Sequence, residues 1–167
     1  IHVVKAALPH LRDQGGGRIL QLSSYGGQAT NPGASLYHAS KWGIEGFMES
    51  TAKDVAPFGI GVTIVEPGGA RTEFRTGSAR LAENRLNAYD TSPAVMTRRI
   101  SDPSLPPSPG DPVKMAQAMI DSVDVDPAPL RLVLGSDAYA AIHAGLTERL
   151  AALEAQHDLA PTTDDAR

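Results

Sequence analysis

The stretch Tyr37-His38-Ala39-Ser40-Lys41 lies in a helix predicted over residues 35–56, and the strand–helix–strand order around it decides the fold. The phenol of Tyr37 and the ammonium of Lys41 are four residues apart, so on a helix they share one face, one turn apart. A lysine cation near a phenol favours the phenolate form, which suits the pair to proton transfer.

Two short apolar runs flank this helix. Arg18-Ile-Leu-Gln-Leu22 predicts a strand over 18–23 that ends at Ser24, and Gly61-Val-Thr-Ile-Val-Glu-Pro-Gly68 predicts a strand over 61–66 that ends in a Pro-Gly turn. Apolar strands separated by helices are typical of a parallel sheet covered on both faces. We therefore expect an α/β fold of the doubly wound class. In this fold the Ser24 hydroxyl, the Tyr37–Lys41 pair and the Pro67-Gly68 turn converge.

The chain opens inside a helical pattern, with Ile1, Val4, Leu8 and Leu11 on one stripe. A kink is expected near Pro9, and the glycines at 15–17 end the helix, predicted over 1–14. No helix-start signal precedes Ile1, so we expect the sequence to be the C-terminal part of a longer protein. The alternative is a chain that begins with a frayed helix.

The second half contains a long irregular segment and two further helices. Residues 72–100 predict short helical pieces around 79–86, and five prolines in 101–112 exclude regular structure there. A mobile segment after a strand end is well placed to cover a ligand. Asp111 is a candidate helix cap, residues 130–134 predict the third strand, and Ser136 or Asp137 is expected to cap the last helix.

Apolar stripes at helical spacing predict which helix faces meet the core. The predicted stripes are Leu36, Ala39, Gly43, Ile44, Phe47 and Thr51; Val113, Ala116, Met119, Ile120 and Val123; and Tyr139, Ile142, Leu146, Leu150 and Leu153. Gly43 and Gly46 weaken a helix, so we expect them to permit a close backbone approach. Residues 1–156 are assigned to the C-terminal part of a single domain, and residues 157–167 are expected to form a disordered tail.

The composition excludes several classes of function. The 167 residues include 15 basic and 19 acidic side chains, a net charge of −4, which provides no electrostatic footprint for nucleic acid or an anionic membrane. No cysteine is present, and the five histidines show no metal-ligand spacing, so no metal site is expected. No membrane-spanning run is visible, and a soluble cytoplasmic protein is the default expectation.

The joint pattern resembles the short-chain dehydrogenase/reductase family. Tyr37-x-x-x-Lys41 lies thirteen residues after Ser24 and ahead of a strand that ends in Pro67-Gly68-x-x-x-Thr72, and the resemblance covers residues 1–75 closely. It implies a Rossmann-type sheet of which this chain holds only the last three strands and their helices. The half with the glycine-rich dinucleotide turn is absent from the sequence, so the strand over 18–23 would leave one edge unpaired.

The resemblance also implies roles for the residues at the site. Tyr37 would act as general acid or base on a small-molecule carbonyl or alcohol, Ser24 would hydrogen-bond the same oxygen, and Lys41 would assist Tyr37 and bind the nicotinamide ribose. Tyr37 and Lys41 thus also count as cofactor-binding residues. The cofactor would be NAD or NADP, with its nicotinamide fixed by the turn that contains Pro67, Gly68, Ala70 and Thr72.

Other interpretations remain open at this stage. The first is a non-catalytic or inactive member of the same family that binds a dinucleotide or serves as a scaffold. Ser50-Thr-Ala-Lys53 matches the Ser-x-x-Lys pattern of serine acylases, but the companion motifs of that class are absent, so these residues are expected to be ordinary helix surface.

The resemblance also bears on the oligomeric state. Family members commonly dimerise through the helices that match 1–14 and 35–56, and many are tetramers, so a homodimer or homotetramer is expected.

Overall fold

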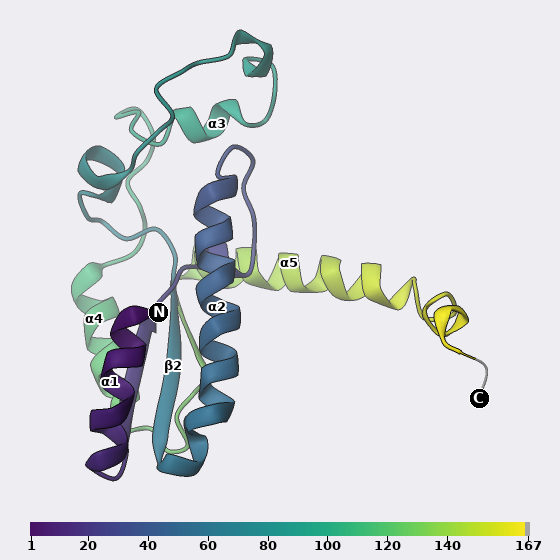
Figure 1. Cartoon of the computed structure of the whole chain (residues 1–167). Coiled ribbons are helices and arrows are strands. Elements are labelled where there is room, and N and C mark those ends of the chain that lie inside the picture. The colour runs from purple at the N-terminus through teal and green to yellow at the C-terminus, as the bar shows by residue number, and fades with distance from the viewer. Residues whose placement is uncertain (166–167) are drawn as a thin grey trace.

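The computed structural model describes residues 1–165 and confirms the α/β class. Figure 1 shows a small sheet between helices, a raised irregular segment above it and a long helix that projects sideways. The main helices are α1 His2–Asp13, α2 Ser35–Val55, α3 Val95–Arg98, α4 Pro112–Asp121 and α5 Ser136–Glu154, and the strands are β1 Gly17–Leu22, β2 Ile60–Pro67 and β3 Arg131–Leu134.

The sheet has the order β1-β2-β3, and both pairs of strands are parallel, as predicted. Leu22 lies beside Val65 at the end of β1, and Pro67 lies beside Leu134 at the end of β3. The carboxyl ends of all three strands therefore meet at one edge of the sheet. Within the described residues the outer side of β1 has no strand partner, which agrees with the predicted unpaired edge.

Helices cover both faces of the sheet, which confirms the doubly wound arrangement. On one face α1 and α2 contribute Val4, Met48 and Val55, which pack against Ile60 and Ile64 of β2. On the other face α4 packs its Met115 against Val65 and Leu134. Successive residues of β2 point to opposite faces, so a continuous apolar strand serves both layers.

The predicted core stripe of α2 is confirmed only in part: Thr51 is buried and Ile44 and Phe47 pack against the core, but the first residues of the stripe do not. Leu36 is 86% exposed, whereas the buried residues are His38, Glu45, Met48, Thr51 and Val55. His38 and Glu45 are polar side chains whose partners lie in the β1–α2 loop and the sheet, and an apolar pattern does not detect them. Gly43 and Gly46 face open space in this chain, so the expected close approach is not made within the described residues.

The stripes predicted for the last two long helices are also confirmed only in part, at Met119 of α4, which packs against the core, and at Ile142 of α5, which is buried. On α4 the buried residue is Met115, while Val113 and Ile120 are exposed. On α5, Ala138 and Ile142 are buried, and the other apolar residues of the stripe are exposed: Tyr139, Leu146, Leu150 and Leu153. The physical reason is that α5 leaves the sheet and extends outward (Figure 1), so much of it has no neighbour among the described residues to pack against.

The segment 72–110 stands above the carboxyl ends of the strands (Figure 1). The helical pieces expected around 79–86 are not formed; a turn of π-helix spans Phe74–Ser78 instead, and a 3-10 turn spans Asn87–Tyr89. The expected tail over 157–167 contains a 3-10 turn at Ala160–Thr163, and its last two residues lie outside the described part. Among the residues described, no helix is long and apolar enough to cross a membrane.

Candidate functional site

Ser24 lies two residues after the last residue of β1 and is the N-cap of a short 3-10 turn, η1, over Tyr25–Gly27. Its side chain is buried, and its Oγ accepts a hydrogen bond of 3.1 Å from the backbone N–H of Gly26. This contact is an N-cap, which explains why a serine at this position starts the turn. The hydroxyl hydrogen of Ser24 is not used by the cap and can be donated to another oxygen.

Tyr37 lies in the first turn of α2 with its ring against η1. A Cβ atom on Gly26 would lie 2.9 Å from Cε1 of Tyr37, so only glycine leaves room for the ring. The Tyr37 ring meets the His38 ring edge-on at 5.6 Å and lies 6.5 Å from the ring of Phe74. The phenol is therefore partly exposed between η1 and the segment that stands above the sheet.

Lys41 lies one helical turn after Tyr37 and reaches the end of β1. Its Nζ is 5.8 Å from the centre of the Tyr37 ring and donates a 2.9 Å hydrogen bond to the carbonyl of Ser23. Burial lowers the pKa of Lys41, and the neighbouring Glu45 carboxylate acts in the opposite direction. The spacing of Tyr37 and Lys41 thus places both side chains beside the turn that Ser24 begins.

His38 holds the loop between η1 and α2 in place. Its Nε2 accepts a 2.8 Å hydrogen bond from the N–H of Asn31, so its Nδ1 carries the proton and donates to the carbonyl of Gly26 at 2.8 Å. The side chain is buried and is fully used by these two contacts. His38 is therefore a structural clamp for the loop rather than a free base.

The backbone of the turn after β2 is anchored to the end of β3 and to the segment above the sheet. The N–H of Gly68 donates to the carbonyl of Leu134 at 2.8 Å, and the carbonyl of Gly69 accepts the N–H of Gly110 at 2.8 Å beside an isolated bridge at Ala70. From Gly68 to Thr72, the N–H of Ala70 alone donates to no acceptor within the described chain. This amide is therefore available to a bound molecule.

Asp137 fixes the same turn from the first turn of α5. Its Oδ2 accepts a 2.7 Å hydrogen bond from the N–H of Gly69. The sequence suggested Ser136 or Asp137 as the cap of this helix, but the N-cap is Gly135 and makes no side-chain cap. A local capping pattern could not reveal this role, because the partner of Asp137 is 68 residues away in the sequence.

A buried acidic cluster lies beneath η1, and none of the sequence patterns predicted it. Glu45 of α2 is 4% exposed and Glu66 of β2 is 0% exposed, and both lie beside Arg131 of β3. Burial, together with the charge of Glu45, raises the pKa of Glu66 to about 7. A glutamate inside an otherwise apolar strand was the one signal in the sequence that could have indicated this cluster.

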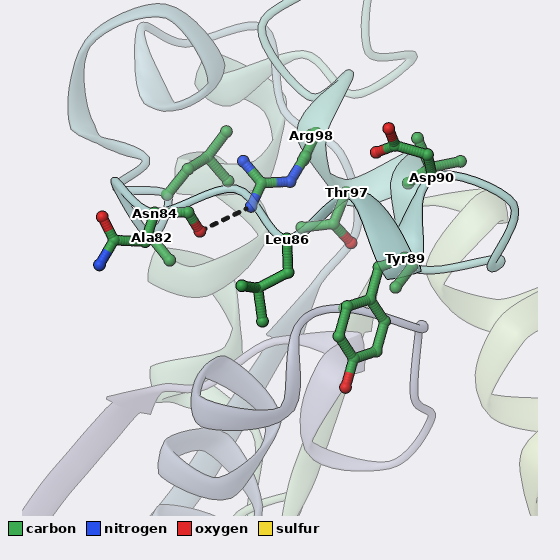
Figure 2. A pocket seen from close by; sticks show the side chains of 11 residues that line it. Ala82, Asn84, Leu86, Tyr89, Asp90, Thr97 and Arg98 are labelled. Atoms are coloured by element: carbon green, nitrogen blue, oxygen red, sulfur yellow. Dashed lines mark hydrogen bonds between the residues drawn. The ribbon is translucent and has the colours of Figure 1, made fainter.

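Two cavities flank the candidate site, both in the segment above the sheet. One, of about 270 Å³, lies within that segment, and its lining includes Leu86, Tyr89, Thr97 and Arg98. Figure 2 shows Leu86 and Tyr89 pointing the same way, while the Arg98 guanidinium is hydrogen-bonded to the carbonyl of Asn84. Neither Ser24 nor Tyr37 nor Lys41 lines this cavity.

The other cavity, of about 430 Å³, lies beside the turn after β2 and includes Ala70 and Thr72 in its lining. The segment above the sheet is tied to the loop before α2, because Thr97 Oγ1 donates a 2.6 Å hydrogen bond to the carbonyl of Pro32. Among the described residues, no group of three metal-binding side chains is arranged to hold an ion. The site therefore combines a hydroxyl, a phenol, an amine and a free backbone amide.

Comparisons with known proteins show which family this chain resembles in sequence and fold. A family model described as short chain dehydrogenase matches residues 1–82. The solved structure of a short-chain dehydrogenase from Streptomyces avermitilis superposes with a TM-score of 0.84 at 39% identity, covering 96% of this chain and 57% of that one.

Curated relatives from fungi and bacteria are oxidoreductases by name. The oxidoreductase BOA17 of Botryotinia fuckeliana is 37% identical over 142 residues, which are 83% of this chain and 50% of the relative. A 3-ketodihydrosphingosine reductase of Bacteroides thetaiotaomicron is 40% identical over 74 residues, 44% of this chain and 28% of that protein. The chain spans about half the length, or less, of the curated relatives that it matches.

Proposed function

The chain belongs to the short-chain dehydrogenase/reductase family. On this premise we propose that it carries the catalytic residues of an NAD- or NADP-dependent oxidoreductase. The reaction is hydride transfer between the nicotinamide and a small carbonyl compound or secondary alcohol. The observation that carries the proposal is the placement of Lys41 Nζ 5.8 Å from the Tyr37 ring, beside the turn that Ser24 caps. A module that only binds has no need of a phenol paired with an amine.

In this proposal each polar side chain of the site has a task in the proton transfer. Tyr37 donates its phenolic proton to the carbonyl oxygen during reduction and takes a proton from the alcohol during oxidation. The free hydroxyl hydrogen of Ser24 binds the same oxygen and orients the substrate. Lys41 stabilises the phenolate that Tyr37 leaves behind, because an adjacent cation favours the charged form.

The residues proposed to hold the cofactor lie on both sides of Tyr37. Lys41 and Tyr37 bind its nicotinamide ribose, and the turn that contains Pro67, Gly68, Ala70 and Thr72 fixes the ring. The free N–H of Ala70 supports this assignment, because a fixed backbone donor can bind a carboxamide oxygen without any side chain. The nicotinamide supplies or accepts the hydride, and the protein contributes position and charge.

Replacement of Tyr37 by Phe tests the proposal in the full-length protein. We expect dinucleotide binding, followed by fluorescence titration with NADH and NADPH, to be kept, and turnover to fall by at least about a hundredfold. The substrate panel includes simple ketones, secondary alcohols and 3-ketodihydrosphingosine, which one relative names. Tyr139→Phe on the exposed face of α5 is the matched control and should leave turnover unchanged.

The rival function predicts a different result from the same experiment. If the protein is a non-catalytic member of the family, the natural protein, Tyr37→Phe and Tyr139→Phe should all bind dinucleotide, and none of them should turn over any of the substrates. Turnover in the natural protein that survives Tyr37→Phe would remove Tyr37 from the mechanism.

We also propose that the full-length protein forms a homodimer or homotetramer through α1 and α2. The outward face of α2 supports this, because a Cβ atom added to Gly43 or Gly46 would meet no neighbouring atom of the described residues within 4 Å. Small residues allow a second helix to approach closely. Light scattering should give a mass of at least two chains, and a monomeric mass at micromolar concentration would contradict the proposal.

A further inference from the structure

Carboxyl groups from α2 and β2 converge on one guanidinium beneath the candidate site. Arg131 at the start of β3 faces Glu45 and Glu49 of α2 and Glu66 at the end of β2, and Gln28 joins them from the loop after η1. None of these residues has a task in the mechanism proposed above. All of them nevertheless lie next to elements that contribute residues to it.

The distances show that a single cation is shared among three carboxyl groups. Arg131 Nε is 3.4 Å from Glu45 Oε2 and 3.2 Å from Glu66 Oε1, and Arg131 Nη2 is 2.7 Å from Glu49 Oε2. The Glu49 side chain is 41% exposed and is well solvated, whereas those of Glu45 and Glu66 are 5% and 1% exposed. Two buried carboxyl groups therefore depend on one arginine that is already bound to a third.

The hydrogen bonds are incomplete if both buried groups are ionised. Both oxygens of Glu66 and the Oε1 of Glu45 are buried and receive no hydrogen bond from the described residues. A buried ionised carboxylate without donors is strongly unfavourable, and two of them close together are more so. A single proton held between the two groups removes one charge and supplies the missing donor.

We propose that Glu66 is a neutral carboxylic acid whose O–H donates a hydrogen bond to the Glu45 carboxylate, and that this acid pair positions Lys41 and η1 for the reaction. The second half of this statement rests on the proposed function. The first half concerns protonation alone and stands without it. Glu45 and Glu66 are positioning residues here, because neither is assigned a contact with substrate or cofactor.

The pair is mechanically connected to the site through Glu45. Lys41 lies one helical turn before Glu45 on α2, and Gln28 Nε2 donates a 3.3 Å hydrogen bond to Glu45 Oε2. A Cβ atom on Gly27 would lie only 2.6 Å from Glu45 Cγ, so η1 and Glu45 are in close contact. Glu66 is followed directly by Pro67, the first residue of the turn proposed to hold the nicotinamide.

Ionisation of Glu66 would disturb this arrangement. The charged groups around it are Glu45, Glu49 and Lys41 on α2 and Arg131 on β3, and Arg149 of α5 contacts Gln28 at 3.4 Å. A second buried negative charge would repel Glu45, and among the described residues no cation besides Arg131 pairs with either group. Because η1 lies directly against Glu45, a displacement of Glu45 would move η1 and the turn of α2 that includes Lys41.

The proton is tested by infrared difference spectroscopy of the full-length protein against its Glu66→Gln variant. At pH 5.5 we expect the natural protein to show a protonated-carboxyl carbonyl band that Glu66→Gln lacks and that Glu49→Gln keeps. The band should disappear as the pH rises to 9. If Glu66 shows only a carboxylate signature at pH 5.5, the proposal is overturned, and this measurement does not depend on turnover.

The positioning role is tested by the pH profile of kcat. Gln imitates the neutral acid and cannot ionise, so the ratio of kcat between Glu66→Gln and the natural protein should grow several-fold as the pH rises from 6 to 9. Glu49→Gln should follow the natural profile, and Glu66→Leu, which also removes the donor, should lose at least about tenfold in kcat at all pH values. A flat ratio for Glu66→Gln, or full activity of Glu66→Leu, would overturn the positioning role.

Failure of the proposed function has a different signature. In that case neither the natural protein nor any variant turns over substrate, and the positioning role of the acid pair is rejected together with the proposed function. The infrared band then decides the protonation of the pair on its own.

Discussion

Gly27 shows how closely a single residue can constrain the site. A methyl group there would lie 2.6 Å from Glu45 Cγ and 2.9 Å from Ser23 Oγ, and both of these side chains are buried. We expect Gly27→Ala to lower the free energy of unfolding by about 1–3 kcal/mol, as overpacking of a buried contact does. Urea unfolding of the full-length protein measures this change.

The control for this substitution is Gly77→Ala. A Cβ atom on Gly77 would lie 3.8 Å from the nearest atom, the Cβ of Glu73, which is ordinary contact. Its effect should stay within about 0.5 kcal/mol, as is usual for exposed positions. Equal effects of the two substitutions would show that η1 can move away from Glu45.

Glu66 makes the stability of the fold depend on pH. Burial raises its pKa to about 7 from 4.5, so the folded state holds this proton more tightly than the unfolded state does. The stabilisation by the neutral acid is therefore fully present below pH 4.5 and is lost as the pH rises through about 7. The difference corresponds to something on the order of 3 kcal/mol.

Denaturant unfolding at a series of pH values measures this dependence. Relative to Glu66→Gln, the natural protein should become progressively less stable between pH 4.5 and 7 and then stay constant. A difference between the two proteins that is constant over this window would show that Glu66 is ionised throughout.

At the scale of elements, one side chain joins α5 to the turn after β2. Asp137 Oδ2 accepts the N–H of Gly69, and Gly68 leaves no room for a side chain beside the same carboxylate. Asp137→Ala should cost about 1–3 kcal/mol in the free energy of unfolding, because it leaves this amide without its charged partner. Dinucleotide binding should weaken with it, because the turn that contains Ala70 loses an anchor.

Asp137→Asn is the conservative variant for the same contact. It keeps an acceptor oxygen and should recover most of the stability and of the dinucleotide affinity measured by titration. If Asp137→Ala binds dinucleotide as tightly as the natural protein, the turn is held by its other contacts, to Leu134 and Gly110.

The bounds of the main helices and strands were predictable to within one or two residues, but the buried faces of α2, α4 and α5 were predictable only in part. The Tyr37–Lys41 spacing correctly put both side chains on one face of α2, because this depends only on helix geometry. The core face of α2 was predicted from apolar residues, and the actual face includes the polar His38 and Glu45. Their burial depends on partners from the loop and the sheet, which no periodic pattern along α2 contains.

For the whole molecule, the free edge of β1 determines how this chain behaves by itself. Its backbone groups pair with β2 on one side only, within the residues described. An open strand edge is a template for pairing with other chains. We therefore expect residues 1–167, expressed alone, to unfold with low cooperativity and to aggregate at micromolar concentration.

Calorimetry and light scattering of this chain check the expectation. A sharp and reversible transition at high temperature would contradict it.

The sequence by itself determined the α/β class, the parallel strands, the Tyr37–Lys41 pair and its place between Ser24 and the Pro67-Gly68 turn. These features follow from local spacing, in which each residue is judged against its near neighbours. Only the tertiary structure decided that Glu45, Glu66 and Arg131 share one buried site, that Asp137 holds Gly69, and that α5 stands away from the sheet. Such contacts join residues far apart in the chain, and burial changes the chemistry of a side chain only once the fold has removed it from water.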